Sequence, residues 1–240
     1  MGFNQIIFGA KNIIMGIHLL DERHLERLPV DSIIFNTEQL ANETTNWNKI
    51  IARCAETFDV LDYSQRNVDK FKLMGCKNAR LFKIGHQPEL SRLLSAPNQD
   101  IDILFYGSLN QRRGAILNEL ILRGLKVKML FGAYGKERDL FIERSKLVLN
   151  HHFYTEQVFE IVRVFYLLTN SVPVVGEVND ATSIDDMYKG GIYLASYKDL
   201  VAGCIEVVKD DSLRKELKRA ALDTIAKYPQ KYFTQEALGL

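Results

Sequence analysis

The chain has 240 residues, 47% of them hydrophobic, which is enough for one large domain or two modest ones. Its 31 basic and 30 acidic residues leave a net charge of +1, so a general attraction to nucleic acid or to an anionic membrane is excluded. Any site for an anionic ligand must therefore be local.

Three widely spaced cysteines match neither a C-x-x-C motif nor a His-paired metal pattern. We expect Cys54, Cys76 and Cys204 to be reduced, buried thiols of a cytoplasmic protein. No apolar run approaches the roughly 20 residues of a membrane span. The N-terminal residues also lack the basic, apolar and small-residue sections of a signal peptide.

Short apolar runs separated by helix-length segments occupy the first hundred residues, and they predict a small α/β domain over residues 1–95. The segment 86–100 contains two prolines and many polar residues, so we expect it to link this domain to a second one over residues 96–240. The candidate strands of the first domain are 5–10, 32–38, 60–64 and 80–85.

From Asp100 onward the pattern is more regular. Five short apolar runs end in turn or polar residues, and amphipathic segments of helix length lie between them. Continuous rather than alternating apolar strands predict βαβ units around a parallel sheet. The segment 211–228 predicts a charged amphipathic helix. The five candidate strands are 101–107, 125–132, 146–152, 172–177 and 191–196.

The first of these strands runs into a glycine turn, and two arginines follow where a helix begins. Cations at a helix N-terminus oppose the helix dipole, so their presence there indicates another role. Backbone N–H groups of a turn together with a guanidinium bind phosphate well, although an ordinary capped turn with solvated arginines would look the same. No G-x-G-x-x-G or Walker motif is present. The candidate residues are Gly107, Ser108, Asn110, Arg112 and Arg113.

The strand 146–150 ends in Asn150, His151 and His152, and Tyr154 follows shortly after. Side chains alternate along a strand, so the adjacent histidines are not a metal pair. One histidine would bind a substrate by a hydrogen bond while the other packs. The alternative is simply the polar start of a loop.

A predicted helix over residues 155–170 places Glu160 and Arg163 on one face, beside Phe159. A carboxylate near the start of this helix can accept hydrogen bonds from both hydroxyls of a ribose. The arginine can hold that carboxylate or reach a phosphate. The alternative is a salt bridge within the helix, at the edge of the core.

Acidic residues elsewhere are weaker candidates. Glu38, Asp62 and Tyr63 follow apolar runs of the first domain and can line the same cleft, although a carboxylate at a strand end is usually a cap. Asp100 and Asp102 match the Asp-x-Asp spacing of metal-dependent sugar transferases. They enter a strand rather than leave it, so we predict no metal site there.

Four stretches taken together resemble bacterial GT-B glycosyltransferases of the group-1-like and spore-maturation-like kind. The best match is a Phe-Glu-x-x-Arg phrase followed by a Leu-rich helix, a small-residue turn and Pro-Val-Val. It resembles a donor-site signature in which a glutamate on the helix binds the ribose of a nucleotide-sugar. The stretches are "NTEQL…LDYSQRNVDKFKLMG", "FYGSLNQRRGAIL", "VLNHHFY" and "FEIVRVFYLLTNSVPVVGE".

The resemblance implies two Rossmann-like domains with parallel sheets, the N-terminal one reduced or truncated, and a metal-independent enzyme without a cofactor. A nucleotide-diphosphate sugar would bind mainly in the second domain and a glycan, lipid or protein acceptor in the first. Glu160 would bind the ribose, and Glu38 is the candidate base for the acceptor hydroxyl. The implied donor site comprises Gly107, Ser108, Asn110, Arg112, Arg113, Asn150, His151, His152, Tyr154, Phe159, Glu160 and Arg163.

Two departures from the family pattern stand out. Glu177 follows Glu160 by 17 residues, which differs from the familiar spacing of two glutamates, and the glycine-rich turn expected near the N-terminus is missing. A catalytically silent GT-B-like module that binds a nucleotide or a glycan, or that completes a partner enzyme, is therefore the alternative function. A sugar epimerase with the same fold is a third.

Overall fold

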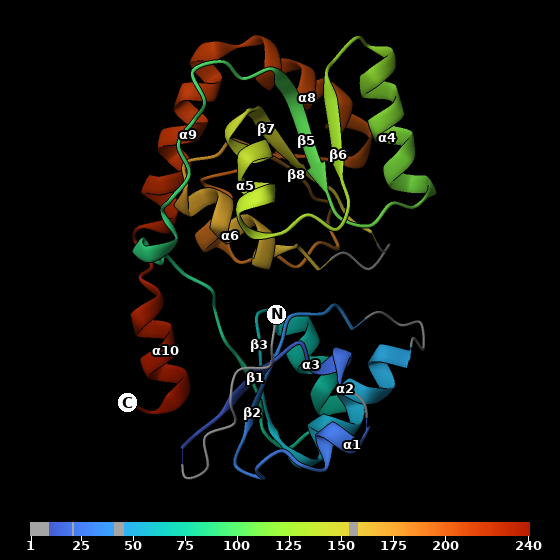
Figure 1. Cartoon of the computed structure of the whole chain (residues 1–240), viewed down its shortest axis with the longest axis vertical. Helices are drawn as coiled ribbons and strands as arrows, with labels where there is room; N and C mark the ends of the chain where they lie inside the picture. Colours follow the sequence, from blue (N-terminus) through green and yellow to red (C-terminus); the bar gives the residue numbers. More distant parts are fainter. Residues whose placement is uncertain (1–9, 21, 41–45, 154–157) are drawn as a thin grey trace. The chain divides into compact units, whose positions relative to one another are not determined.

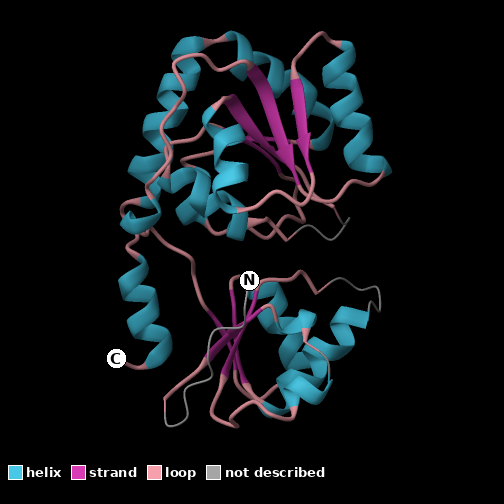
Figure 2. Cartoon of the chain, viewed as in Figure 1, coloured by secondary structure: helices cyan, strands magenta, loops and turns pink. Residues whose placement is uncertain are grey.

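The computed structural model describes the chain apart from residues 1–9, 21, 41–45 and 154–157. Its contacts divide the chain into two compact units. Unit 1 contains Met1–Lys83 and Phe233–Leu240, and unit 2 contains Ile84–Tyr232. Each unit has its own parallel sheet with helices (Figures 1 and 2), so the predicted α/β fold class with two parallel sheets is confirmed.

The sheet of unit 1 has four parallel strands in the order β1-β2-β3-β4. Each crossover leads to the next strand in the same direction, so the helices α1 to α3 gather on one face (Figure 1). Ile34 and Val60 of the sheet form one core with Ile51 and Phe71 of the helices, and all four are at most 1% exposed. The elements are β1 (Ile13–Met15), η1 (Ile17–Leu19), α1 (Glu22–Leu25), β2 (Ile33–Asn36), α2 (Asn46–Thr57), β3 (Asp59–Asp62), α3 (Gln65–Leu73) and β4 (Ala79–Leu81).

The predicted strands of unit 1 match the structure except at its start. The candidates 32–38, 60–64 and 80–85 overlap β2, β3 and β4. The candidate 5–10 lies outside the described residues except for Ala10, which is not in a strand. The first described strand, β1, lies at the edge of the sheet and exposes Ile13 and Met15 by 47% and 61%. It is short and half exposed, so it carries no buried apolar run by which to recognise it.

The sheet of unit 2 has five parallel strands in the order β6-β5-β7-β8-β9. The chain passes from β5 to β6 on one side and then returns to place β7 on the other side of β5. The strand order therefore reverses between β5 and β7, and in open α/β sheets ligands bind beyond the carboxyl ends of the strands at such a switch point. The strands are β5 (Ile101–Tyr106), β6 (Val127–Leu130), β7 (Ser145–Asn150), β8 (Val174–Glu177) and β9 (Tyr193–Ala195), and all five overlap predicted ones.

Helices cover both faces of this sheet (Figure 1). Ile103 and Phe105 point to the face covered by α4 and α8, where they join Leu117 and Cys204 in a core that excludes water. Tyr106, the next residue, points to the face of α5 and α6. The helices of unit 2 are η2 (Pro88–Leu90), α4 (Gln111–Leu122), α5 (Gly135–Glu143), α6 (Ile161–Thr169), α7 (Asp186–Lys189), η3 (Tyr197–Asp199), α8 (Leu200–Lys209), α9 (Asp211–Ile225) and α10 (Gln230–Leu238), the last of which ends in unit 1.

Of two helices predicted from the sequence, one matches the structure and the other is shorter than predicted. The charged helix 211–228 is confirmed as α9, which begins after the cap Asp210 and buries Leu217, Ala221 and Ile225 along one side. The helix over 155–170 is too long as predicted. Its described part becomes helical only at Ile161, because Val158 pairs instead with Ser183 in a parallel bridge.

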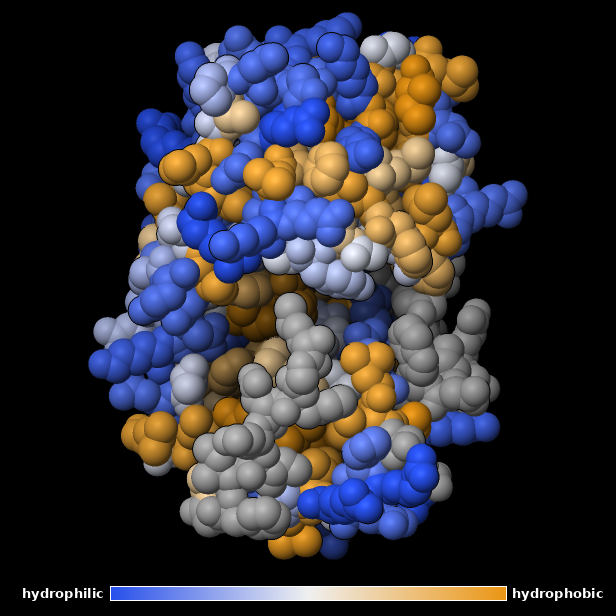
Figure 3. Space-filling model, viewed as in Figure 1, coloured by the Kyte–Doolittle hydropathy of each residue, from blue (hydrophilic) through white to orange (hydrophobic). Residues whose placement is uncertain are grey.

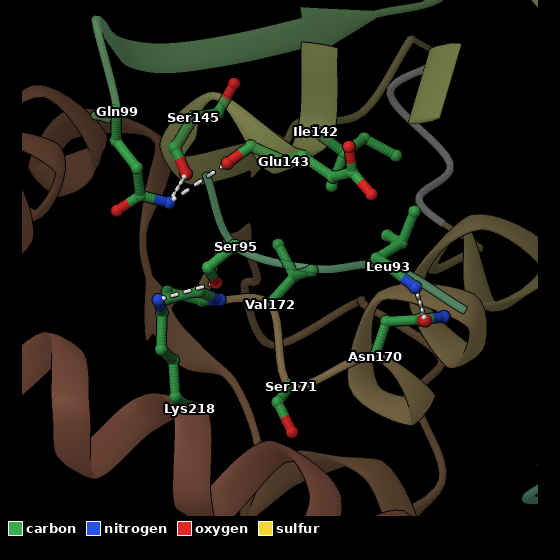
Figure 4. Close-up of a pocket in the computed structure, with 11 residues that line it drawn as sticks. Leu93, Ser95, Gln99, Ile142, Glu143, Ser145, Asn170, Ser171, Val172 and Lys218 are labelled. Carbon is green, nitrogen blue, oxygen red and sulfur yellow. Dashed lines mark hydrogen bonds between the residues drawn. The ribbon is translucent and has the colours of Figure 1, made fainter. Parts of the chain in front are cut away.

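The segment 86–100, predicted as a linker, belongs to unit 2 by its contacts. Asn170 holds it, because its Oδ1 accepts the N–H groups of Arg92 (2.8 Å) and Leu93 (2.9 Å). Gln99 donates to the carbonyl of Ser145 at 2.6 Å (Figure 4). The division between the units therefore lies at Lys83, before the two prolines, rather than at residues 95–96.

A cavity lies beneath this segment, at the amino-terminal ends of β7 and β8 (Figure 4). Lys218 of α9 reaches across it and donates to the Ser95 hydroxyl at 3.0 Å. The space is about 10 Å³, roughly the room that one water molecule needs. This end of the sheet is therefore a packed structural junction, and the site must be sought at the opposite end.

The three cysteines are free and buried. Burial raises the pKa of the Cys54 thiol to about 11 and that of Cys204 to about 12, so both are neutral and unreactive at pH 7.

Hydrophilic residues cover much of the surface of unit 2 where α8 and α9 meet (Figure 3). Lys209, Asp210, Lys215 and Glu216 are exposed in this region. Among the helices that the structure describes, none combines the length and the apolar character needed to cross a bilayer.

The Tyr188 hydroxyl binds the backbone at the start of unit 2, and its removal tests how much this contact stabilises the fold. It donates to the Ile84 carbonyl at 2.7 Å and accepts the Ile84 N–H at 3.2 Å, and both residues are buried. We expect Tyr188→Phe to lower the free energy of unfolding by about 1–3 kcal/mol, because it leaves two buried backbone groups without a partner. Urea unfolding measures the loss.

The matched control is Tyr193→Phe, whose hydroxyl donates to Glu206 in an exposed hydrogen bond of 2.7 Å. Water replaces that partner, so the change should stay within about 0.5 kcal/mol. Equal losses for the two variants would contradict the role given to Tyr188.

Candidate functional site

Polar residues gather at the carboxyl ends of β5, β7 and β8 in unit 2. They come from the turn between β5 and α4, from the loop after β7 and from the start of α6, and we call this cluster the switch-point site. The structure thus brings together most of the residues that the sequence predicted for a donor site. Its members are Gly107, Ser108, Asn110, Arg112, Arg113, Asn150, His151, His152, Glu160, Arg163 and Glu177.

The turn after β5 depends on Gly107 and Asn110. Gly107 has φ of 134°, and a Cβ there would lie 3.0 Å from Nη2 of Arg163 and 3.6 Å from Nη1 of Arg113. Asn110 caps α4 by accepting the Arg113 N–H at 2.9 Å, and its Nδ2 donates to the Phe153 carbonyl at 2.8 Å. The positive φ therefore favours glycine at this position, a side chain there would crowd the guanidinium of Arg163, and Asn110 joins the two loops.

Arg113 is the arginine that faces inward, with 3% of its surface exposed. Its Nε donates to the His151 carbonyl at 2.9 Å, its Nη1 donates to the Ser108 carbonyl at 2.8 Å, and its Nη2 lies 3.2 Å from Oε1 of Glu160. Burial lowers its pKa to about 10, which leaves it charged at pH 7. Arg113 therefore ties three segments of the site together.

Arg112 is the other arginine of this pair, and the sequence did not distinguish it from Arg113. It forms a two-pronged salt bridge with Glu177, one contact being 2.7 Å between Nη1 and Oε2. Its guanidinium carbon lies 4.0 Å from the ring centroid of Tyr197. The turn of about 100° per residue in α4 points Arg112 away from Arg113 and toward the end of β8.

Glu177 ends β8 and is fully buried. Besides Arg112, it accepts the His152 N–H at 3.1 Å. The sequence drew attention to Glu177 only through its distance from Glu160, and Tyr197 was not predicted at all. The pattern that could have identified Glu177 is a carboxylate that follows directly after an apolar run, at the end of a predicted strand.

Glu160 lies at the start of α6 with 13% of its side chain exposed. Its Oε2 accepts from Nδ2 of Asn150 at 3.0 Å and lies 3.3 Å from Nδ1 of His152. Burial alone would raise its pKa, but the neighbouring His152 ring and the charges of Arg163 and Arg113 lower it to about 2. Glu160 is therefore an ionised acceptor at pH 7.

Arg163 does not form the salt bridge within a helix that was the alternative for this pair, and Glu160 is the N-cap residue of α6 rather than part of the helix. Its Nη1 donates instead to Oδ1 of Asn150 at 2.9 Å. Asn150 thus forms a hydrogen bond with each of these two residues.

The two histidines point to different neighbours, as strand alternation predicted. The His151 ring lies 5.9 Å from Tyr197 and 6.4 Å from Phe105, whereas the His152 ring lies 6.1 Å from Phe159. Burial, and then the charges of Arg112 and Arg113, lower the pKa of His151 to about 3, so it is neutral at pH 7.

Phe159 is 1% exposed and packs against Gly176, where a Cβ would lie 3.0 Å from its ring. It therefore supports the site from the core. Tyr154, also predicted for the donor site, lies outside the described residues.

Glu38 belongs to unit 1, where it follows β2. Its carboxylate is 33% exposed and its Oε1 lies 3.6 Å from Nε2 of His18. Its carbonyl accepts from the side-chain amides of Asn36 (2.8 Å) and Asn67 (2.9 Å), so the backbone of this loop is fixed. Its role as a base stays a prediction.

Asp62, at the end of β3, is fully buried beneath this loop. Asn36 donates to it at 2.6 Å and Asn67 at 3.1 Å, and it accepts the Ser64 N–H at 2.8 Å. Burial raises its pKa to about 7 against these hydrogen bonds. Asp62 therefore shapes the loop from below and does not face a ligand.

Asp100 and Asp102 lie at the amino-terminal end of the sheet, as predicted, and pair with Arg144 and Lys146. In the part of the chain that the structure describes, no group of three or more His, Cys, Asp or Glu side chains is placed to hold a metal ion.

Comparisons with known proteins identify the fold. No family model matches the chain. The uncharacterized protein L137 of Acanthamoeba polyphaga mimivirus is 26% identical over 215 residues, which are 85% of this chain and 28% of that protein. The uncharacterized protein L138 of the same virus is 25% identical over 78% of this chain and 21% of its own length. The chain thus spans less than a third of these two relatives.

Solved structures of GT-B glycosyltransferases match the fold at low sequence identity. HepE from Anabaena, in complex with UDP and glucose, has a TM-score of 0.63 and 13% identity over 90% of this chain and 72% of its own. TarM has a TM-score of 0.60 and 14% identity over 87% of this chain and 49% of its own. Sucrose-phosphate synthase from Thermosynechococcus elongatus has a TM-score of 0.57 and 10% identity over 89% and 68%. The chain therefore has the GT-B glycosyltransferase fold.

The neutral state of His151 predicts how stability depends on pH. Its pKa of about 3 in the folded chain lies below the value near 6.5 of an unfolded histidine. From pH 6.5 downward the unfolded state binds a proton that the folded state does not, so stability falls by at most about 1.4 kcal/mol per pH unit from this group. We expect His151→Gln to flatten the pH dependence of the unfolding free energy between pH 6.5 and 4.5. Parallel curves for the two proteins would contradict it.

The Arg112–Glu177 pair predicts that the loss of either partner lowers the free energy of unfolding by a different amount. Arg112→Met leaves a buried carboxylate without its cation, which costs roughly 3–5 kcal/mol. Glu177→Gln should cost less, because the side chain of Arg112 is 23% exposed and can turn its charge to water. Denaturant unfolding of both variants measures the order, and a larger loss for Glu177→Gln would contradict the assignment.

Proposed function

We propose that this chain transfers a sugar from a nucleotide-diphosphate sugar to an acceptor, without a metal ion or a cofactor. The observation that carries this proposal is Glu160. It is an ionised carboxylate at the switch point of the sheet, held by Asn150 and His152, with its side chain 13% exposed. Such a group suits the two hydroxyls of a ribose, because each hydroxyl donates one hydrogen bond to a carboxylate.

The likeness to HepE supports a nucleotide donor, because HepE was solved with UDP, with UDP and glucose, and with UDP-glucose. The GT-B fold supports glycosyl transfer as the reaction. When a glycosidic bond to a diphosphate breaks, negative charge grows on the leaving phosphate, so positive groups beside that phosphate lower the barrier. The two guanidinium groups near Gly107, those of Arg113 and Arg163, support this part of the proposal.

On the acceptor side, Glu38 is our candidate for the base that takes the hydroxyl proton. It follows β2 at the carboxyl end of the sheet of unit 1, is one-third exposed and lies beside His18. The acceptor itself is a glycan, a lipid or a protein, and the proposal does not depend on which of them binds.

The first test is a thermal-shift screen against nucleosides, nucleoside diphosphates and nucleotide-sugars. A ligand that binds the folded state alone raises the melting temperature by mass action. Release of nucleoside diphosphate from a stabilising nucleotide-sugar then establishes turnover. Binding without turnover would identify a silent binding module, and the absence of any stabilising nucleotide would refute the donor site.

Glu160→Gln tests the ribose contact. We expect it to weaken nucleotide binding by about 1–3 kcal/mol, the scale of a hydrogen bond to a charged group. Titration calorimetry with the stabilising nucleotide measures the change. Glu119→Gln is the matched control, because Glu119 lies on α4 in an exposed pair with Arg123. Unchanged affinity in a folded Glu160→Gln protein would leave Glu160 as a purely structural partner of Arg113.

A further inference from the structure

The strand β6 lies at the edge of the sheet of unit 2, next to α4 (Figure 1). Among the described residues it pairs only with β5. The carbonyls of Lys126 and Leu130 point to that side, where they accept N–H groups of β5 and of the turn after it at 2.9 and 3.2 Å. Backbone groups alternate in direction along a strand, so the N–H and C=O groups of Val127, Met129 and Phe131 point away from the sheet.

Large apolar side chains surround this free edge. Met129 and Phe131 are 41% and 83% exposed, and Ile121 and Leu122, the last residues of α4, are 44% and 81% exposed. Tyr134, a few residues beyond β6, is 73% exposed. Figure 3 shows hydrophobic residues on the side of unit 2 where α4 lies. Proteins usually protect an edge strand with charges or a covering segment, so an open apolar edge indicates a partner.

The outer side of α4 lacks the charges that other helices of unit 2 expose. The exposed residues of α9 include Lys215, Glu216 and Arg219. In α4, the exposed residues after its first position are all uncharged, and they are Ala115, Asn118, Ile121 and Leu122. The core of a protein–protein interface is depleted of charged residues in the same way, so α4 and β6 together have the composition of an interface.

We propose that unit 2 binds a second copy of this chain edge to edge, through antiparallel pairing of the two β6 strands about a two-fold axis at Met129. In this register Met129 lies opposite its counterpart, and Val127 lies opposite Phe131 of the second copy. These are the residues whose backbone groups point outward, so each pair exchanges two N–H···O=C hydrogen bonds. A two-fold axis requires a surface that is complementary to itself, and the free edge of β6 meets that requirement.

The side chains agree with the same register. Val127 packs against the core beneath α4, and alternation places Met129 and Phe131 on the same face of the sheet. Antiparallel pairing brings the start of one β6 beside the end of the other. Ile121 and Leu122, which precede the start of β6, therefore approach Phe131 of the second copy.

Lys128 is the charged residue within β6, and this register separates it from its counterpart. Its Nζ lies 5.0 Å from the ring centroid of Phe141 on α5, so the ammonium group lies along the face of the sheet. Pairing about Met129 places Lys128 opposite Leu130 of the second copy. Pairing about Lys128 would place two ammonium groups directly opposite each other, and like charges in that position are destabilising.

The exposed apolar surface is large enough for a stable dimer. An aromatic side chain buries roughly 150–250 Å², so the rings of Phe131 and Tyr134 from both copies bring on the order of 600 Å². Ile121, Leu122 and Met129 from both copies add a comparable area. The total reaches the lower limit of about 1,200 Å² for specific interfaces. The pairing also joins the two five-stranded sheets into one continuous sheet.

Sedimentation equilibrium over a range of protein concentrations tests the dimer. The wild-type chain should reach twice the mass of a single chain. Met129→Arg places two like charges on the axis, so it should raise the dissociation constant at least tenfold. Met74→Arg is the matched control, because Met74 ends α3 in unit 1 and is also 41% exposed. We expect its dissociation constant to equal that of the wild type.

A disulfide tests the register. In the proposed pairing the two Met129 Cα atoms are about 5.5 Å apart, within the range of about 4.4–6.8 Å that a disulfide spans. Met129→Cys should therefore form a covalent dimer when oxidised glutathione accepts the two electrons. Lys128→Cys is the control, because diagonal neighbours are about 7–8 Å apart. The three native cysteines are buried, so they do not compete.

These measurements need no nucleotide, so the inference does not rest on the proposed function. Circular dichroism and melting temperature establish that each variant is folded. A wild-type chain that stays monomeric at every concentration would overturn the proposal. So would a dimer that Met129→Arg leaves intact, or equal crosslinking of the Met129→Cys and Lys128→Cys variants on non-reducing gels.

Discussion

The switch-point site depends on the burial of one cation, Arg113. A guanidinium removed from water must find partners for its N–H groups, and Arg113 finds them on the β5 turn, on the loop after β7 and at Glu160. Arg113 lies 38 residues before His151 and 47 residues before Glu160 in the chain. The need to satisfy one buried charge therefore links parts of the site that are distant in sequence.

Both units use the same physical device at the carboxyl end of their sheets. In unit 1 the buried carboxylate of Asp62 accepts hydrogen bonds from Asn36 and Asn67, which in turn hold the carbonyl of Glu38. In unit 2 the buried carboxylate of Glu177 holds Arg112 and the backbone of His152. A buried carboxyl group whose oxygens are hydrogen-bonded fixes the loop around it, and each loop then presents one less buried carboxylate, Glu38 or Glu160.

Local pattern was enough to find the strands of unit 2 and the polar residues that follow them. Continuous apolar runs such as 101–107 and 146–152 predict a parallel sheet. All strands of such a sheet point the same way, so the residues that follow them meet at one edge. The start of α6 was beyond this reasoning. Its apolar period extends back through Val158, and only the pairing of that residue with Ser183 ends the helix there.

The sequence by itself determined the α/β class, the order of most strands along the chain and the gathering of Gly107, Asn150 and Glu160 at one edge, because periodicity and turn residues are local properties. Only the tertiary structure decided which arginine is paired and which is not. Arg112, Arg113 and Arg163 carry the same charge in the sequence, and their difference comes from Glu177, Glu160 and Asn150, which lie up to 65 residues away along the chain. Ion pairing depends on distances in space, and no local pattern encodes these.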